Sequence, residues 1–167
     1  MYIALFTSSV LLDSLGSEQS KPFLQAVPET YGAAETAAGF IWRTRPAEYV
    51  LDESGKPKRI AYTATPSFYD DPDNVVQTLS VWADIPFAWA YVYRGKHLDA
   101  LRQRGEWMHK PVHAQYVLWW LPKDSTPTHI EGVKRLEQLD KDGSKPNSFT
   151  FRAAFSASGE SVDVARV

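Results

Sequence analysis

The sequence predicts an α+β fold of the split-βαβ, ferredoxin-like type, in which an antiparallel sheet carries helices on one face. Residues 2–10 and 75–82 each combine β-branched, aromatic and aliphatic residues, as buried strands do. Each of these segments is followed by a stretch with the apolar spacing of a helix. The complete order is β-α-β, a long connection, β-α-α and β-α-β, which gives about five strands.

The first half of the chain predicts one helix between two strands. Residues 18–38 have helical apolar spacing, although Pro28 should kink or divide this helix because proline lacks the backbone donor. Residues 40–45 alternate large apolar with polar side chains. We therefore expect Phe40 and Trp42 on the same face of a second strand.

The second half of the chain predicts three further strands and three helical segments. The strand at 75–82 is followed directly by Asp84, a residue type that caps helix N-termini. The remaining predicted elements are a helix from Asp84 through Val92, a helical segment at 96–108 after Gly95, a strand at 113–121, a helix from Thr126 to Gly143 and a strand at 148–155.

The length of 167 residues, with 44% hydrophobic residues, suits a single domain spanning 1–167. Within it, the polar connection at about 46–74 is an insertion. It contains a predicted turn at 53–57 and a predicted hairpin arm at 60–65. A connection of this length in a compact domain is usually functional or mobile.

The composition excludes several classes of function. Lys and Arg total 18 against 20 Asp and Glu, a net charge of −2, so no broad cationic field is available to bind nucleic acid. The chain has no cysteine, which excludes disulfides, thiolate metal sites and a cysteine nucleophile. No apolar run approaches the ~20 residues of a membrane span, and the N-terminus lacks a signal-peptide pattern. We therefore expect a cytoplasmic protein that binds neither membranes nor nucleic acid.

A sheet with helices on only one face leaves its other face bare. The bare face of such a sheet must be buried against something, and a second copy of the same sheet is a common solution. The predicted fold therefore leads us to expect a homodimer.

Several short strings in this chain are more specific than general apolar patterning. They are Gly39-Phe40-Ile41-Trp42-Arg43, Leu79-Ser80-Val81-Trp82, Tyr93 with His97, Leu101, Arg102, Arg104 and Glu106-Trp107, Val117-Leu118-Trp119-Trp120-Leu121-Pro122, and Ser148-Phe149-Thr150-Phe151. Together they resemble the bacterial family catalogued as domain of unknown function 3291, of the dimeric α/β-barrel superfamily. The resemblance spans roughly residues 40–151, and rare tryptophans recur in it in the same order and at matching spacing.

This resemblance implies a pocket more clearly than a reaction. The superfamily includes cofactor-free antibiotic-biosynthesis monooxygenases, small-molecule cyclases and isomerases, and heme-binding branches. In these proteins the ligand usually lies between the concave face of the sheet and its covering helices. A fold alone assigns no reaction, so the candidate residues must be considered one by one.

His97 is the first candidate for chemistry. One side of a helix would be shared by positions 93, 97, 100, 101 and 104. This spacing predicts a stripe of Tyr93, His97 and Arg104, with Leu98 and Met108 pointing elsewhere. His97 could then be a general base or an axial ligand to heme iron. Equally, it could hydrogen-bond a carbonyl or Glu106 and fasten the helix to the sheet.

The two nearby arginines have different expected roles. A guanidinium group fits the two oxygens of a carboxylate or a heme propionate. For Arg102 we favour a surface ion pair with Asp99 or Glu106, because such pairs are common. For Arg104 both interpretations remain open.

The chain has six tryptophans and eight tyrosines, most of which we expect in the core or at an interface. An aromatic-walled cavity would suit a flat, hydrophobic substrate. Because neighbouring strand residues face opposite ways, only one of Trp119 and Trp120 can line such a cavity. The predicted substrate contacts are Trp42, Trp82, Trp89, Trp107 and Trp119.

No metal site is predicted. His109 and His113 are four residues apart, but Pro111 between them breaks the helical geometry that would direct both to one ion. His129 has no partner with ligand spacing.

The leading hypothesis is a small-molecule enzyme of monooxygenase-like, cyclase or isomerase type that acts on a hydrophobic aromatic or polyketide-like substrate. In this hypothesis His97 is the acid or base, and Tyr93 and Arg104 orient a substrate oxygen, without a cofactor. Two alternatives remain: a heme enzyme with His97 as axial ligand, and a non-catalytic module that binds an apolar ligand.

Overall fold

The computed structural model describes residues 1–45, 49–51, 53–55, 57–59 and 64–164. In chain order the elements are β1 (Tyr2–Val10), α1 (Lys21–Glu35), β2 (Phe40–Arg43), β3 (Tyr49–Leu51), β4 (Pro57–Arg59), the 3₁₀ helix η1 (Pro72–Asn74), β5 (Val75–Trp82), α2 (Ile85–Val92), α3 (Gly95–Gln103), the 3₁₀ helix η2 (Arg104–Glu106), β6 (Tyr116–Leu121), α4 (His129–Asp142), β7 (Ala154–Phe155) and β8 (Ser161–Val162).

The centre of the fold is a four-stranded antiparallel sheet with the strand order β2-β5-β1-β6. β1 and β2 are consecutive in the chain but are separated in the sheet by β5, which is the split-βαβ arrangement. The register pairs Ile3 with Trp82 on one side of β1 and with Trp120 on the other. The predicted α+β, ferredoxin-like class is therefore confirmed.

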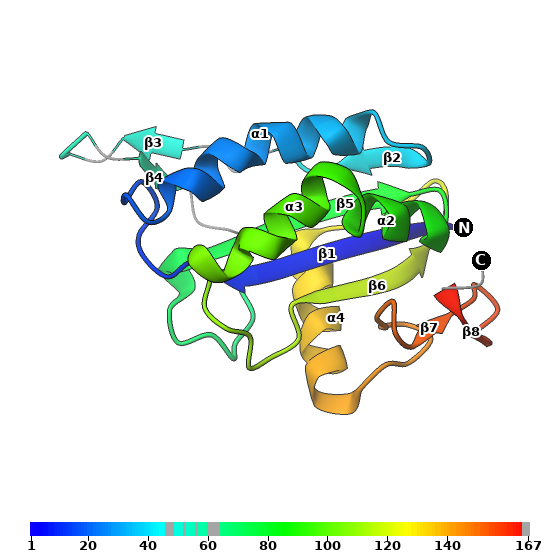
Figure 1. Ribbon diagram of the computed structural model, residues 1–167. Coiled ribbons are helices and arrows are strands. Elements are labelled where there is room, and N and C mark those ends of the chain that lie inside the picture. Colours follow the sequence, from blue (N-terminus) through cyan, green and yellow to red (C-terminus); the bar gives the residue numbers. More distant parts are fainter. Residues whose placement is uncertain (46–48, 52, 56, 60–63, 165–167) are drawn as a thin grey trace.

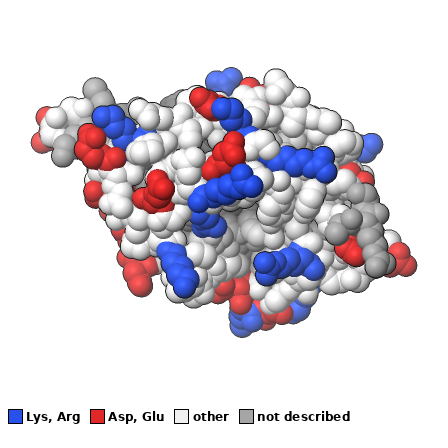
Figure 2. Space-filling model, viewed as in Figure 1, with Lys and Arg blue, Asp and Glu red and all other residues white. Residues whose placement is uncertain are grey.

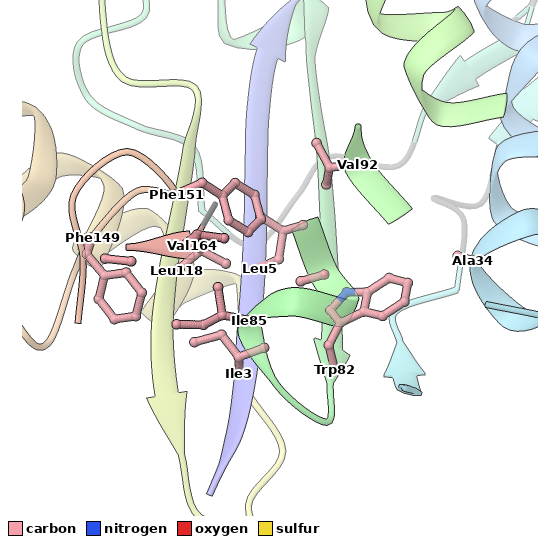
Figure 3. Close-up of a cluster of buried hydrophobic side chains, with 12 residues drawn as sticks. Ile3, Leu5, Ala34, Trp82, Ile85, Val92, Leu118, Phe149, Phe151 and Val164 are labelled. Atoms are coloured by element: carbon pink, nitrogen blue, oxygen red, sulfur yellow. The ribbon is translucent and has the colours of Figure 1, made fainter. Parts of the chain in front are cut away.

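Helices α1, α2 and α3 lie on one face of the sheet, which we call the helix face (Figure 1). At one end of this face, large side chains from β1, β5, β6 and α2 pack into a continuous core. Figure 3 shows Ile3, Leu5, Trp82, Ile85 and Leu118 directed toward one another in this cluster. Asp84 begins α2 as predicted, since its Oδ1 accepts a hydrogen bond of 2.7 Å from the Ile85 amide.

The opposite face of the sheet is not bare, in contrast to the expectation from the sequence. Helix α4 crosses behind β1 and β6 in Figure 1 and contacts both strands. Its Val133, Leu136 and Leu139 are buried against Phe6 and Trp119. The sequence predicted this helix but not its side of the sheet, because apolar spacing identifies the buried stripe of a helix and not the surface that buries it.

A β-bulge changes the faces of the second strand. Phe40 pairs with Trp82, whereas Trp42 pairs with Val81, so the register shifts between Phe40 and Trp42. Phe40 therefore packs with the helix-face core and Trp42 with the cluster under α4. The prediction that both share one face is wrong, because a bulge breaks the period of two on which it depends.

Other predicted elements differ in detail. Pro28 lies inside α1 and does not divide it. The cap of α4 is Thr128, whose Oγ1 accepts from the Glu131 amide, instead of Thr126. The strand predicted at 148–155 is reduced to one bridge to the sheet, between Phe149 and Leu118, two local bridges and the short β7.

The connection between β2 and β5 contains a short hairpin. Its two strands are β3 and β4, which flank the predicted turn at 53–57. The hairpin arm predicted at 60–65 falls partly on residues 60–63, which lie outside the described residues.

Candidate active site

A cavity of about 450 Å³ lies between the helix face of the sheet and helices α1 and α3. This volume is within the range of about 300–1,000 Å³ that is typical of small-molecule sites. It arises because the side chains of β1 on this face become smaller along the strand, from Ile3 and Leu5 to Thr7 and Ser9. The large residues fill one end of the face, and the small ones leave the other end open.

The floor of the cavity carries hydroxyl groups in an otherwise apolar surface. Thr7 and Thr78 are paired across β1 and β5, and their Oγ1 atoms are 2.7 Å apart. Ser9 and Val76 extend the floor toward the open end. In such a pair one hydroxyl donates to the other, which keeps its own O–H as a donor at the floor.

The roof is formed by small and aromatic residues of α1 together with one side of α3. Ala26 and Ala100 leave space between the two helices, and Phe23 and Tyr31 close the ends of the α1 side. All five positions of the predicted stripe line this roof: Tyr93, His97, Ala100, Leu101 and Arg104. The predicted spacing thus places these residues on one cavity.

The stripe is not carried by one continuous helix. Helix α2 ends at Val92 with Tyr93 as its cap, and α3 begins at Gly95, where φ is +56°. This left-handed conformation favours glycine and lets the chain change direction between the two helices. Met108, which was expected to point elsewhere, also lines the cavity.

His97 is held in one orientation by a backbone carbonyl. Its Nδ1 lies 3.0 Å from the carbonyl oxygen of Val92, and its ring packs against Tyr91 with centroids 4.8 Å apart. Because a carbonyl can only accept a hydrogen bond, Nδ1 carries the proton. This bond is the structural role foreseen for His97, although it ties α3 to the end of α2 and not to the sheet.

The same bond determines what His97 can do chemically. Burial lowers the pKa of His97 below its usual value, with the Val92 hydrogen bond acting in the opposite direction. The imidazole is therefore neutral near pH 7, and its Nε2 has a free lone pair. His97 lines the cavity, so this lone pair is available as a proton acceptor.

Arg102 lies on the surface of the protein, whereas Arg104 lies in the wall of the cavity. Arg102 is exposed and lies 3.7 Å from Asp99, which is the surface ion pair favoured above. Arg104 is partly buried in the cavity wall and donates from its Nη2 to the side-chain oxygen of Gln115. Burial lowers the pKa of the Arg104 guanidinium, an effect that Tyr69 partly offsets.

Tyr116 is a cavity residue that the sequence did not single out. Its hydroxyl accepts a hydrogen bond of 3.3 Å from the Phe151 amide. Burial raises the pKa of Tyr116 to about 12, and neighbouring Tyr93 adds to the effect, so the phenol stays protonated and can donate. Alternation along the strand could have identified Tyr116, because it shares the helix face with Leu118 and Trp120.

Of the five tryptophans predicted to contact substrate, only Trp107 lines the cavity. It is buried, and its indole N–H has no hydrogen-bond partner among the described residues. Trp82 lies on the helix face but at its filled end, where it stacks on Tyr91. Trp89, on α2, packs against the Tyr93 ring outside the cavity.

The remaining two tryptophans lie on the face covered by α4. The bulge in β2 places Trp42 there, and strand alternation places Trp119 there, below Arg135. Trp120 is therefore the member of the pair on the helix face, where it donates to the Phe155 carbonyl over 2.7 Å. No substrate contact is proposed for Trp42, Trp82, Trp89 or Trp119.

Two of the other three histidines are engaged elsewhere, and His109 is exposed. His113 binds Asp140 over 2.9 Å, and His129 binds Gln77 over 2.9 Å. Within the described residues there is no group of three His, Cys, Asp or Glu side chains that could hold a metal ion.

None of the helices in the described ranges combines the length and the apolar character needed to cross a bilayer.

Several solved structures are similar to this chain at low sequence identity. NE2512, a protein of unknown function from Nitrosomonas europaea, is 10% identical with a TM-score of 0.47, covering 76% of this chain and 95% of its own. SnoaB, a cofactor-independent oxygenase from Streptomyces nogalater, is 11% identical with a TM-score of 0.45, covering 75% and 97%. A proposed antibiotic biosynthesis monooxygenase from Nitrosomonas europaea is 12% identical with a TM-score of 0.44, covering 75% and 93%.

These TM-scores are below 0.5, so the fold assignment rests on the strand order and connections of the sheet itself. No curated protein matches the chain. A family model, in contrast, matches residues 2–165, which is nearly the whole sequence and extends the resemblance beyond 40–151 at both ends. The chain therefore belongs to the family described as Domain of unknown function (DUF3291).

Proposed function

We propose that this chain is a small-molecule enzyme of monooxygenase-like or rearrangement type, acting on a hydrophobic aromatic or polyketide-like substrate in the cavity. The observation that carries this proposal is the neutral imidazole of His97, which is held through Nδ1 and lines the cavity. A cavity that only binds an apolar ligand has no need of a positioned base.

In the proposed mechanism, Nε2 of His97 accepts a proton from an acidic C–H or O–H group of the substrate. The imidazole becomes imidazolium, and the negative charge is delocalised over the aromatic system and its oxygen. Tyr93 and Arg104, which line the same cavity, orient and stabilise that oxygen. Proton removal of this kind is a first step shared by cofactor-free oxygenation and by rearrangement, so it is the step to test.

The test is proton exchange at the carbon next to the carbonyl of 2-tetralone, a fused bicyclic ketone, followed by NMR in deuterated water. We expect the protein to accelerate exchange and His97→Gln to lower the protein-catalysed rate by about 100-fold or more. His109→Gln is the matched control, because His109 is exposed and outside the cavity lining. Full activity in a folded His97→Gln protein would contradict the proposal. An inactive wild type would leave the non-catalytic binding module.

The heme alternative has one supporting observation. The Nδ1 bond to a carbonyl leaves Nε2 free for iron, the arrangement common in ligating histidines, and Arg104 could pair with a propionate. Heme bound there would supply redox and oxygen chemistry. A Soret band that appears on adding hemin and is lost in His97→Gln would establish this alternative. A spectrum with hemin that equals the spectrum of free hemin would exclude it.

A further inference from the structure

Arg104 is the one feature of the cavity that its apolar lining does not explain. Among the described residues that line the cavity, no aspartate, glutamate or lysine occurs, so Arg104 carries the only full charge there. Its side chain hydrogen-bonds to Gln115, which is neutral. No carboxylate lies within ion-pair distance of Arg104 in the part of the chain that the structure describes.

The other partly buried arginines each have the carboxylate partner that Arg104 does not have. Arg43 lies 2.6 Å from Glu35, and Arg135 lies 2.8 Å from Glu131. On the surface, too, acidic and basic side chains are intermingled over the face that carries α1 and α3 (Figure 2). A charge removed from water is unfavourable unless a partner and hydrogen bonds compensate it. Arg104 has a hydrogen bond to Gln115 but no carboxylate partner among the described residues. A bound anion would supply the missing negative charge.

Trp107 lies in the same wall as Arg104, three positions later in the chain and directly after the 3₁₀ helix η2. Its indole nitrogen is enclosed by the protein, so Trp107 offers the cavity its ring and not its N–H group. Arg104 is therefore the group in this wall that can bind an anion.

The spacing along α3 also limits the ligand. His97 and Arg104 are seven residues apart, which at 1.5 Å per residue is about 10 Å along the helix. A ligand that reaches from Arg104 toward His97 can therefore have about the length of two fused aromatic rings. Phe23, Tyr31 and Tyr116 line the cavity and can pack on such rings.

We propose that the ligand of this cavity is an aromatic carboxylic acid, bound with its carboxylate on Arg104 and its ring system extending toward His97. This inference rests on the proposed function in taking the same cavity as the site. It names the class of substrate, assigns the oxygen oriented by Arg104 to the substrate's carboxylate, and leaves Tyr93 to orient an oxygen nearer His97.

The experiment is a calorimetric titration with 2-naphthoate, which is ionised at neutral pH, and with 2-naphthamide, its neutral counterpart of the same shape. Wild type should bind the acid at least about 10-fold more tightly than the amide. Arg104→Gln should weaken acid binding by about 10- to 100-fold and change amide binding by less than about twofold. Arg102→Gln is the matched control, since Arg102 is exposed and outside the cavity lining, and it should leave both affinities unchanged.

Retained amide binding in Arg104→Gln shows that the cavity is still folded, so a loss confined to the acid reports on the charge. The inference is wrong if the amide binds as well as the acid, if Arg104→Gln does not discriminate, if Arg102→Gln has the same effect, or if neither compound binds. Its failure is distinguishable from failure of the proposed function. The titration involves no turnover, and 2-tetralone exchange involves no carboxylate.

Discussion

Burial acts in the same direction on His97 of α3 and on Arg104 at the start of η2 but has opposite chemical results. It lowers the pKa of both His97 and Arg104, because desolvation disfavours the charged form of a base. For His97 this leaves a neutral ring at physiological pH. Arg104, whose usual pKa is far above neutrality, stays charged. One residue becomes a proton acceptor and the other an unpaired cation, within the same apolar cavity.

The lowered pKa of His97 predicts how stability depends on pH. The folded state prefers the neutral ring, while the unfolded chain takes up a proton near pH 6.5, the usual value. The stabilisation is therefore complete above about pH 6.5 and is lost as the pH falls toward the folded-state pKa. We expect the free energy of unfolding, measured by urea titration, to decrease as the pH is lowered from 7 to 5.

His97→Gln should make this pH dependence shallower, whatever its effect on stability at pH 7. His129 contributes in the same sense, because burial also lowers its pKa, so some slope should remain. His109→Gln, at an exposed position, should keep the slope of the wild type. An unchanged slope in His97→Gln would show that His97 titrates as it does in the unfolded chain.

At the residue scale, the sequence predicted the positions of His97 and Arg104 better than the positions of the tryptophans. Helical spacing brought His97 and Arg104 to one side, and the structure places both on the cavity. The tryptophans on strands depended on which face holds the cavity and on an unbroken alternation. The bulge between Phe40 and Trp42 breaks that alternation, and a pattern of large and polar residues does not reveal a bulge.

At the scale of elements, close packing of α4 against β1 determines which sheet face can hold a ligand. Gly132 of α4 lies against the Phe6 ring, where an added Cβ would be 2.6 Å from ring atoms. The helix can approach the sheet this closely because no side chain intervenes. Since α4 fills one face, the cavity can form only on the other, beneath α1 and α3.

Two glycines in helices test this packing. Gly132→Ala should destabilise the protein by about 1–3 kcal/mol, because the clash with Phe6 outweighs the better helix propensity of alanine. Gly32→Ala in α1 is the matched change, since nothing lies within 4 Å of its added Cβ. It should stabilise the protein by about 0.5–1 kcal/mol. Denaturant unfolding measures both. A stabilising Gly132→Ala would mean that α4 does not pack against Phe6 in this way.

For the whole molecule, local patterns predicted the architecture but not how the layers are arranged. The strands β1 and β5 occur within the bounds that their residues indicated, because both are central strands in which many β-branched, aromatic and aliphatic side chains are buried. The position of α4 and the reduction of the last strand to one bridge to the sheet depend on contacts distant in sequence. Neither is visible in local periodicity.

The position of α4 bears on the expected homodimer. That expectation depended on a bare sheet face, and a dimer formed through this face would have to displace α4. Exposing Val133, Leu136 and Leu139 would cost about 1.5–3 kcal/mol for each side chain, before any new contact is made. Among the described residues the exposed large apolar side chains are Met1, Ile41, Phe87, Val112 and Ile130. These side chains belong to separate elements and do not form an exposed apolar face like the one that α4 covers.

The homodimer therefore stays a prediction, and it has to pair through a surface other than the one that α4 covers. Light scattering of the purified protein at micromolar concentration tests it, and a mass of two chains is the expected result. The matched variant is Leu136→Asp, which places a charge beneath α4 and should loosen the helix from the sheet. If α4 shields a face that would otherwise associate, this variant should form larger species than the wild type, whereas a wild-type mass of one chain would contradict the homodimer.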